Sequence, residues 1–355
     1  MSKFWSKIAA SQKPYVPGEQ PKDKKYIKLN TNENPYPPSP EVIEAIKAAA
    51  DENLKLYPDP NGDALRQTLA DYTGLKKDWV FVGNGSDEIL AFAFMAFFDP
   101  GRPLFLPDVT YSFYAVYINL FQLDYQLVPL KEDFSLDPSD YFNSIGGVIF
   151  PNPNAPTGHC IDLEMVEAVL AHNPDRIVIV DEAYIDFGGK SAIPLINQYP
   201  NLLVIQTLSK SRSLAGLRVG FAFGQDELME GLNRIKNSFN SYTLDRPSMA
   251  GAIAAINHEA YFQLTRGKVI RTRERIVPIM TEMGWQVIPS KANFIFISHP
   301  VLRAEDIFAL LRQEGILVRY FRLPRIDNHL RVSIGTDEEM DRLLDTLRKI
   351  TAAVL

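Results

Sequence analysis

Side chains suited to carbonyl and proton chemistry follow two short apolar runs of the sequence. Asp181 and Tyr184 come directly after RIVIV, in DEAYIDF, and Lys210 follows NLLVIQ, in TLSK. A carboxylate that is buried at the end of a strand is costly without a cationic partner. A lysine that acts as a nucleophile needs a sheltered site whose charges tune its amine. A lone lysine is most often solvated, and a lone aspartate in this position is compatible with a solvated strand end, so only the neighbouring segments can point to chemistry.

A third apolar run, WVFV, leads into GNGSDEIL. Gly83 and Gly85 permit a tight turn, and Ser86 and Asp87 then open a helix. The N-terminus of a helix presents free backbone N–H groups and a positive dipole end, which suit a phosphate. The motif is not the dinucleotide fingerprint GxGxxG, because Glu88 stands where the third glycine would be. An ordinary helix cap with Ser86 as the capping residue is the alternative.

Taken together, these segments match the needs of one small molecule. The aldehyde of pyridoxal phosphate takes a lysine, its ring nitrogen takes an aspartate, and its phosphate takes backbone donors with an arginine. Arg218 follows Lys210 by eight residues in TLSKSRSLAGLRVGF and would serve the same ligand. Arg212, between them, is expected to be solvated or to contact a second subunit.

The elements that must position these residues are predicted from the hydrophobic pattern. From about residue 79 to 225, short apolar runs alternate with amphipathic stretches, which favours an α/β fold with a mostly parallel, mixed sheet flanked by helices. Residues 226–283 are expected to be mostly helical, and the tail forms a smaller α+β unit. We expect an N-terminal arm over 1–40 that joins the small domain, a large cofactor-binding domain over 41–255 and a small C-terminal domain over 256–355. In such a sheet, ligands bind beyond the carboxyl ends of the strands.

Composition excludes several other classes of protein. The 37 basic and 43 acidic residues give a net charge of −6, which argues against general nucleic-acid binding and gives no polybasic membrane patch. The single cysteine, Cys160, forms no disulfide within the chain and suits the cytoplasm. No HExxH pair occurs among the five histidines, so no metal site is expected. The first residues contain no apolar region typical of a signal peptide, and the ten-residue run Ile89–Phe98 is too short for a membrane span.

The motifs resemble the fold-type-I pyridoxal-phosphate aminotransferases, class II by sequence, and most closely their histidinol-phosphate branch. The matching stretches run from residue 14 to 336: PYVPGEQ, KLNTNENPYPP, LYPDPNG, GNGSDEIL, PNPNAPTG, IVDEAY, TLSKSRSLAGLRVGF and LRVSIGT. The resemblance implies a ping-pong transfer between L-glutamate and imidazole-acetol phosphate, a step of histidine biosynthesis. It also implies a homodimer with shared active sites. Threonine-phosphate decarboxylases and aromatic amino-acid aminotransferases share these motifs and remain alternatives, and a catalytically idle regulatory domain is disfavoured by the intact lysine, aspartate and tyrosine.

The resemblance also implies a role for each residue. Lys210 would form a Schiff base with the cofactor and carry the proton, Asp181 would hold the ring nitrogen protonated, and Tyr184 would bond the 3′-oxygen. Further cofactor contacts are implied for Ser86, Asp87, Tyr111, Thr207, Ser209, Arg218 and, from the neighbouring subunit, Tyr57. Substrate contacts are implied for Arg331 and Arg319 and for an imidazole pocket of Tyr15, Asn30 and Tyr242, with Arg322 and Arg325 close enough to share the work.

One position departs from the family pattern. The family usually has an asparagine directly before Pro156, and its amide meets the 3′-oxygen. Ala155 stands there in this sequence, and Asn154 is the neighbour expected to substitute. Losing one neutral hydrogen bond costs about 0.5–1.5 kcal/mol, which would tune the cofactor without abolishing its chemistry.

Overall fold

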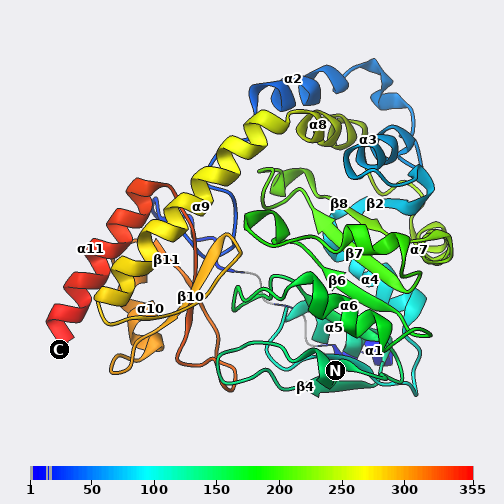
Figure 1. Ribbon diagram of the computed structural model, residues 1–355. Coiled ribbons are helices and arrows are strands. Elements are labelled where there is room, and N and C mark those ends of the chain that lie inside the picture. The colour runs from blue at the N-terminus through cyan, green and yellow to red at the C-terminus, as the bar shows by residue number, and fades with distance from the viewer. Residues whose placement is uncertain (1–2, 13–14, 16–17, 355) are drawn as a thin grey trace.

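A seven-stranded mixed sheet forms the centre of the larger lobe (Figure 1). The computed structural model describes residues 3–12, 15 and 18–354. The strands lie in the order β2-β8-β7-β6-β5-β3-β4, and β8 alone runs opposite to the other six. Their bounds are β2 Val80–Asn84, β3 Leu104–Pro107, β4 Tyr125–Val128, β5 Val148–Pro151, β6 Val178–Asp181, β7 Leu202–Thr207 and β8 Val219–Phe223. The predicted mostly parallel sheet is therefore confirmed.

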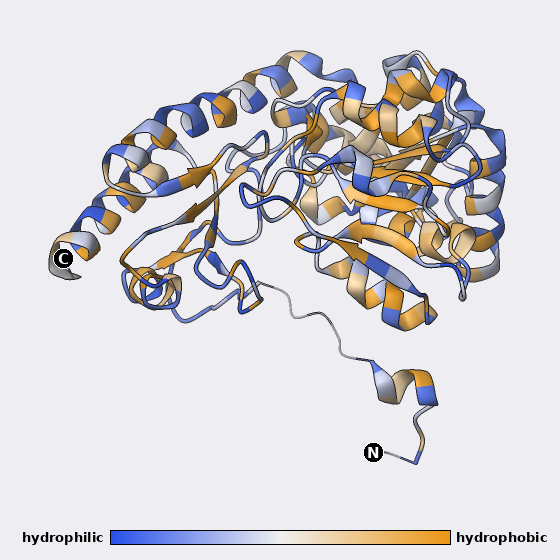
Figure 2. Cartoon of the chain, turned by 60° about the horizontal axis from the view of Figure 1, so that its bottom comes forward, coloured by the Kyte–Doolittle hydropathy of each residue, from blue (hydrophilic) through white to orange (hydrophobic). Residues whose placement is uncertain are grey.

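Both faces of this sheet are buried, which explains why its strands appear as continuous apolar runs. Successive side chains of a strand point to opposite faces. Val178 and Val180 accordingly join one hydrophobic core, whereas Ile177 and Ile179 join the other, which also holds the apolar helix α4 (Gly85–Phe97). Figure 2 shows the strands as hydrophobic ribbons between helices whose outer faces are hydrophilic. The ten-residue apolar run is thus a buried helix, as expected.

A second, smaller sheet forms the other lobe. It has the order β12-β13-β10-β9, with β9 Gln286–Ile288, β10 Phe294–Ser298, β12 Arg319–Tyr320 and β13 Leu330–Ser333, all antiparallel. The N-terminal strand β1 (Ile27–Lys28) pairs in parallel with β11 (Ile316–Leu317), so the N-terminal segment lies in this lobe. Helix α9 (Glu259–Glu282) runs from the large lobe to the small one in Figure 1. The domain limits expected from the sequence stay a prediction.

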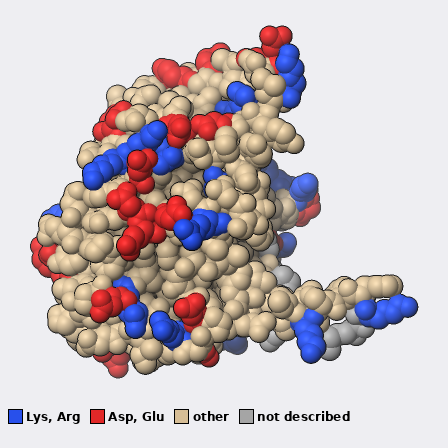
Figure 3. Space-filling model, turned by 90° about the vertical axis from the view of Figure 1, so that its right-hand side faces the viewer, with Lys and Arg blue, Asp and Glu red and all other residues tan. Residues whose placement is uncertain are grey.

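The remaining elements complete the two lobes. The helices are α1 Lys7–Ser11, α2 Pro40–Ala49, α3 Asp63–Thr73, α5 Phe113–Phe121, α6 Leu163–Ala171, α7 Asp226–Phe239, α8 Arg246–Asn257, α10 Ala304–Gln313 and α11 Asp337–Val354. The 3₁₀ turns are η1 Glu52–Lys55, η2 Lys77–Trp79, η3 Pro138–Tyr141, η4 Ile185–Phe187, η5 Ile193–Asn197 and η6 Ala215–Leu217. No helix in the described ranges is long and apolar enough to cross a bilayer. On the face shown in Figure 3, acidic and basic side chains are interspersed.

Candidate active site

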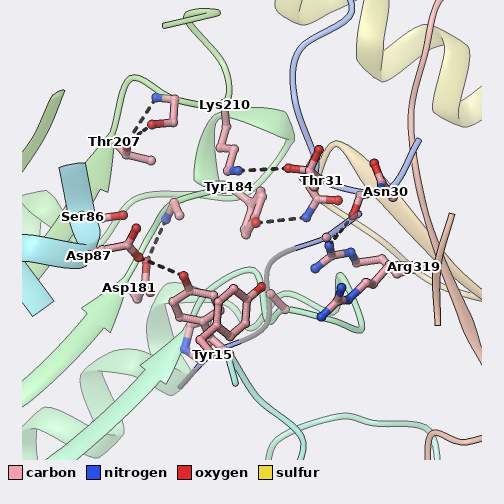
Figure 4. Close-up of a pocket in the computed structure, with 18 of the residues that line it drawn as sticks. Tyr15, Asn30, Thr31, Ser86, Asp87, Asp181, Tyr184, Thr207, Lys210 and Arg319 are labelled. Atoms are coloured by element: carbon pink, nitrogen blue, oxygen red, sulfur yellow. Dashed lines mark hydrogen bonds between the residues drawn. The ribbon is translucent and has the colours of Figure 1, made fainter. Parts of the chain in front are cut away.

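Most of the predicted residues meet in one pocket at the carboxyl ends of β6 and β7. The cavity has a volume of about 150 Å³ and is lined by residues of both lobes. Figure 4 shows Ser86 and Asp87 on one side, Asn30 and Arg319 on the other, and Lys210 and Tyr184 between them. Thirteen predicted residues line it: Tyr15, Asn30, Ser86, Asp87, Tyr111, Asp181, Tyr184, Thr207, Ser209, Lys210, Arg218, Arg319 and Arg331.

Lys210 is held out from a rigid turn that follows β7. The hydroxyl of Thr207 accepts the backbone N–H of Ser209 at 3.1 Å and lies 2.9 Å from the Ser209 hydroxyl. The Lys210 amine donates to the carbonyl of Thr31 at 3.4 Å and lies 5.8 Å from the centre of the Tyr184 ring. Carbonyl and ring are weak partners for an ammonium group, so the amine can turn towards a ligand at small cost.

Asp181 ends β6 as a buried carboxyl. The hydroxyl of Tyr114 donates to its Oδ2 at 2.8 Å, and the backbone N–H of Ala183 donates to its Oδ1 at 3.2 Å. Burial raises the pKa of Asp181 to about 6, even though these hydrogen bonds and the more distant Lys210 charge favour the carboxylate. Within the described residues it forms no ion pair, so a ligand that brings a positive charge would complete this position.

The N-terminus of α4 forms the opposite wall. Strand β8 packs close against it, since a Cβ at Gly220 would lie 2.5 Å from the backbone nitrogen of Ser86. Asp87 accepts the Tyr111 hydroxyl at 2.9 Å and pairs with Arg218 at 3.1 Å. The alternative with Ser86 as the capping residue does not hold, because the helix cap is Asn84. Burial, followed by the Asp87 charge, raises the pKa of Tyr111 well above its ordinary value, so that ring stays neutral.

Two arginines face each other across the small sheet. Arg319 of β12 and Arg331 of β13 are directly opposite in the antiparallel register, where like charges are unfavourable. The Arg331 guanidinium donates to the carbonyl of Asn30 at 3.1 Å, and its Nε is buried without a partner in the described chain. Burial lowers the pKa of Arg331, and the charge of Arg319 lowers it further. An anion beside the Arg331 guanidinium would offset this repulsion and complete the hydrogen bonds of its Nε.

Asn30 and Tyr15 line the same end of the pocket. The Asn30 amide donates to the carbonyl of Glu19 at 2.9 Å, whereas its buried Oδ1 has no partner among the residues described. Tyr15 packs against Phe113, with ring centres 5.1 Å apart. An acceptor and an aromatic face are therefore available beside the arginine pair.

Three predicted residues lie outside this pocket. Both amide hydrogens of Asn154 are used, on the carbonyl of Val109 and the hydroxyl of Thr157, each at 3.0 Å, and Ala155 lines the pocket instead. Tyr57 and Tyr242 stack on each other at 4.6 Å on the surface. Their roles, and the substitution by Asn154, stay predictions.

The arginines beyond the pocket have other partners. Arg212 is not solvated but buried, with a guanidinium that lies 3.8 Å from the Phe262 ring centre and donates to Ala255 and Glu259. Arg322 pairs with Glu305, and Arg325 with Asp108, so neither lines the pocket. The opposite charges that hold these two arginines could not be located from the sequence.

Thr31 and Asn32 line the pocket and were missed by the sequence reasoning. The one signal for them is the asparagine-rich NTNENP, which we interpreted as an extended arm. Tyr114 was missed because it lies behind Asp181, outside the lining.

Comparison with known proteins decides the family. The model of the family described as aminotransferase class I and II matches residues 24–347. The chain belongs to this family. Class I and II aminotransferases depend on pyridoxal 5′-phosphate, so the cofactor expectation is confirmed. Within the described residues, no group of three or more His, Cys, Asp or Glu side chains is placed to hold a metal ion.

Individual aminotransferases and one decarboxylase resemble all or most of the chain. It is 61% identical to a histidinol-phosphate aminotransferase of Clostridium acetobutylicum, over 99% of this chain and 100% of that protein. It also resembles the crystal structure of histidinol-phosphate aminotransferase from Sinorhizobium meliloti in complex with pyridoxal-5′-phosphate, with a TM-score of 0.90, 25% identity and coverage of 100% and 99%. The L-threonine-O-3-phosphate decarboxylase of Porphyromonas gingivalis has a TM-score of 0.80 at 19% identity, over 92% of this chain and 99% of that one, and therefore shares the fold alone.

Proposed function

We propose that this aminotransferase moves the amino group of L-glutamate to imidazole-acetol phosphate, which yields 2-oxoglutarate and L-histidinol phosphate in histidine biosynthesis. The name of the 61% identical relative supports this reaction. The observation that carries it is the pair Arg319 and Arg331 in the same pocket as Lys210 and Asp181.

The residues around the pocket fit pyridoxal phosphate. Bound there, it would act as the electron sink for a substrate that has lost a proton. We propose that Asp181 keeps the ring nitrogen protonated and that the Lys210 amine binds the cofactor and then transfers the proton. Tyr184 holds the 3′-oxygen, and the Tyr111 ring covers one face of the cofactor.

The phosphate end of the cofactor is assigned to the α4 wall. Ser86 and Asp87 lie in the first turn of the helix, where backbone N–H groups have no partner within the helix, and the hydroxyl residues Thr207 and Ser209 line the same pocket. Arg218 would turn from Asp87 to the phosphate, or bridge both, since its present ion pair is about 40% exposed on each side. Exposed pairs of this kind are worth about 0–1 kcal/mol, so exchanging the partner costs little.

The substrate phosphate is assigned to the arginine pair. A doubly charged phosphate would neutralise both guanidinium groups, and the carboxylates of glutamate would use the same donors in the other half-reaction. The Asn30 Oδ1 would accept an imidazole N–H beside the Tyr15 ring. One pocket would then serve both substrates in turn.

The substrate claim is tested by comparing L-histidinol phosphate with L-histidinol as amino donor to 2-oxoglutarate. Losing two charge-assisted contacts of about 1.5–3 kcal/mol each predicts a fall in kcat/KM of roughly two to four orders of magnitude. Carbon dioxide released from threonine phosphate, or a higher kcat/KM with phenylalanine, would refute the claim and favour the alternative enzymes.

We further propose a homodimer with shared active sites. Five large apolar side chains are exposed on η1, at the end of α7 and on the residues that follow each of them: Leu54, Leu56, Tyr57, Phe239 and Tyr242. This group lies next to the start of α4, because the Asn84 amide donates to the carbonyl of Thr243 at 3.3 Å. A second subunit that covered the group would bury it and bring Tyr57 to the neighbouring cofactor.

A mixing experiment tests the sharing. Subunits with Lys210→Ala lack their own lysine, and subunits with Tyr57→Ala damage only the neighbouring site. A hybrid dimer has one site with both residues intact, so activity should rise when the two variants are unfolded and refolded together. No rise above the separate variants, in a mixture shown to contain hybrids, would contradict a shared site. The lone Cys160 suits a reducing compartment, and we propose the cytoplasm as the location.

A further inference from the structure

Asn32 is a buried pocket residue with no role in the proposed reaction so far. It is 1% exposed, and its backbone has a φ of 56°, a left-handed conformation that asparagine tolerates better than most residues. The Asn293 amide donates to its carbonyl at 2.9 Å, which fixes the backbone from the small lobe. A side chain held this firmly has a defined direction.

The direction of its amide follows from a chain of hydrogen bonds. The backbone N–H of Asn32 donates to the hydroxyl of Ser333 at 2.8 Å. That hydroxyl therefore uses its own proton on the Asn32 Oδ1, 3.0 Å away. With Oδ1 fixed as the acceptor, Nδ2 must be the atom that faces Tyr184, and it donates to the tyrosine oxygen at 3.0 Å.

Tyr184 is consequently the acceptor in this contact. Its hydroxyl still has one proton to donate, and within the described ranges Asn32 is its one hydrogen-bond partner. The ring itself is fixed edge-on against Phe294, with centres 5.0 Å apart. The remaining proton is thus available to a ligand in the pocket and not to the protein.

The contact between Asn32 and Tyr184 matters because Ala155 stands where the family usually has an asparagine. Ala155 lines the pocket without a polar side chain, and both amide hydrogens of Asn154 are already used. The amide that does reach the Tyr184 hydroxyl is that of Asn32, on the N-terminal segment. We propose that Asn32 is a positioning residue that obliges the Tyr184 hydroxyl to donate to the 3′-oxygen of the cofactor, and so compensates for the amide absent at Ala155. The proposal rests on the role assigned to Tyr184 above.

The test is a pH titration of the visible absorption band of the bound cofactor in the holoenzyme. A donor at the 3′-oxygen stabilises negative charge there and makes the neighbouring nitrogen easier to deprotonate, so its loss raises the midpoint pH. The variants are Asn32→Gly, since glycine accepts the left-handed backbone, and Ser333→Ala, which frees the amide to rotate. We expect each to raise the midpoint by up to about one unit, the equivalent of one neutral hydrogen bond.

Two further variants make the result specific. Tyr184→Phe should raise the midpoint at least as much, and adding Asn32→Gly to it should change nothing more, because the relay acts through that hydroxyl. Ser298→Ala is the matched control: this serine lies on β10 of the same small sheet, donates to Gln286 at 3.1 Å and should leave the midpoint unchanged.

The outcomes separate this proposal from the proposed function. A raised midpoint in Tyr184→Phe with no change in either Asn32→Gly or Ser333→Ala overturns the relay and leaves the role of Tyr184 intact. An unchanged midpoint in Tyr184→Phe overturns both. An additive effect of Asn32→Gly on the Tyr184→Phe background overturns the claim that Asn32 acts through the tyrosine. Because Ser333→Ala leaves Asn32 itself unaltered, the proposal stays testable even if Asn32→Gly fails to fold.

Discussion

Replacing Asp181 with asparagine should stabilise the protein once its cofactor is removed. Burial raises the pKa of this carboxyl from 3.8 to about 6, so the folded chain holds the proton more tightly than the unfolded chain does. Between these two values folding takes up a proton, and stability falls as the pH rises. Above pH 6 the ionised carboxylate is destabilising by about 3 kcal/mol at most, at 1.36 kcal/mol for each unit.

Asparagine removes this charge with almost no change in shape. Its Oδ1 still accepts the Ala183 N–H, and its Nδ2 donates to the oxygen of Tyr114, whose hydroxyl then no longer donates to this side chain. We therefore expect Asp181→Asn to raise the free energy of unfolding of the cofactor-free protein at pH 8, and to have no such effect below pH 4. The assay is urea denaturation at both pH values and at equal protein concentration. With cofactor bound the sign should reverse, because the variant loses the ion pair with the ring. An apo variant less stable than wild type at pH 8 would refute the view that this charge lacks a partner in the protein.

Three further changes follow from the site. Tyr114→Phe removes the 2.8 Å hydrogen bond to Asp181 and should weaken cofactor binding about tenfold, measured by fluorescence titration of the apoenzyme; unchanged affinity would contradict an orienting role. Arg331→Lys keeps the positive charge but loses the paired N–H donors of the guanidinium group. It should lower kcat/KM for L-histidinol phosphate by at least tenfold. An equal loss with L-histidinol, which has no phosphate, would show that Arg331 does not bind the phosphate. Glu182→Gln should stabilise the protein relative to wild type at pH 8 but not at pH 4, as measured by thermal denaturation. The reason is that burial raises the pKa of Glu182 to about 7 despite hydrogen bonds from Ser191, Ala192 and Gln206. An effect of equal size at both pH values would show that the charge is not the cause.

The sequence predicted the elements whose signal is local. Apolar runs gave the strands, and the polar residue after each run gave Asp181, Lys210 and Ser86, because parallel strands end at one edge of a sheet. The antiparallel direction of β8 carries no such local signal. Nor does its close approach to α4 at Gly220, which only the packed structure displays.

The rest depends on contacts between distant segments. Asn32 and Tyr184 are 152 residues apart, and no spacing rule connects them. Arg212 is buried against the ring of Phe262 on α9 and the carbonyl of Ala255 on α8. Neither contact is visible in the sequence, where the charge of Arg212 alone indicated a solvated side chain or a contact with a second subunit. The opposition of Arg319 and Arg331 required the register of β12 and β13, although both residues were expected to bind substrate.

The most direct test of the account is the visible spectrum of the purified enzyme before and after addition of L-histidinol phosphate without an acceptor. We predict that the yellow band of the bound cofactor disappears in favour of near-ultraviolet absorption, and that 2-oxoglutarate restores it. A yellow enzyme that does not respond to L-histidinol phosphate would contradict the proposed substrate. A protein that takes up no pyridoxal phosphate would contradict the role given to Lys210.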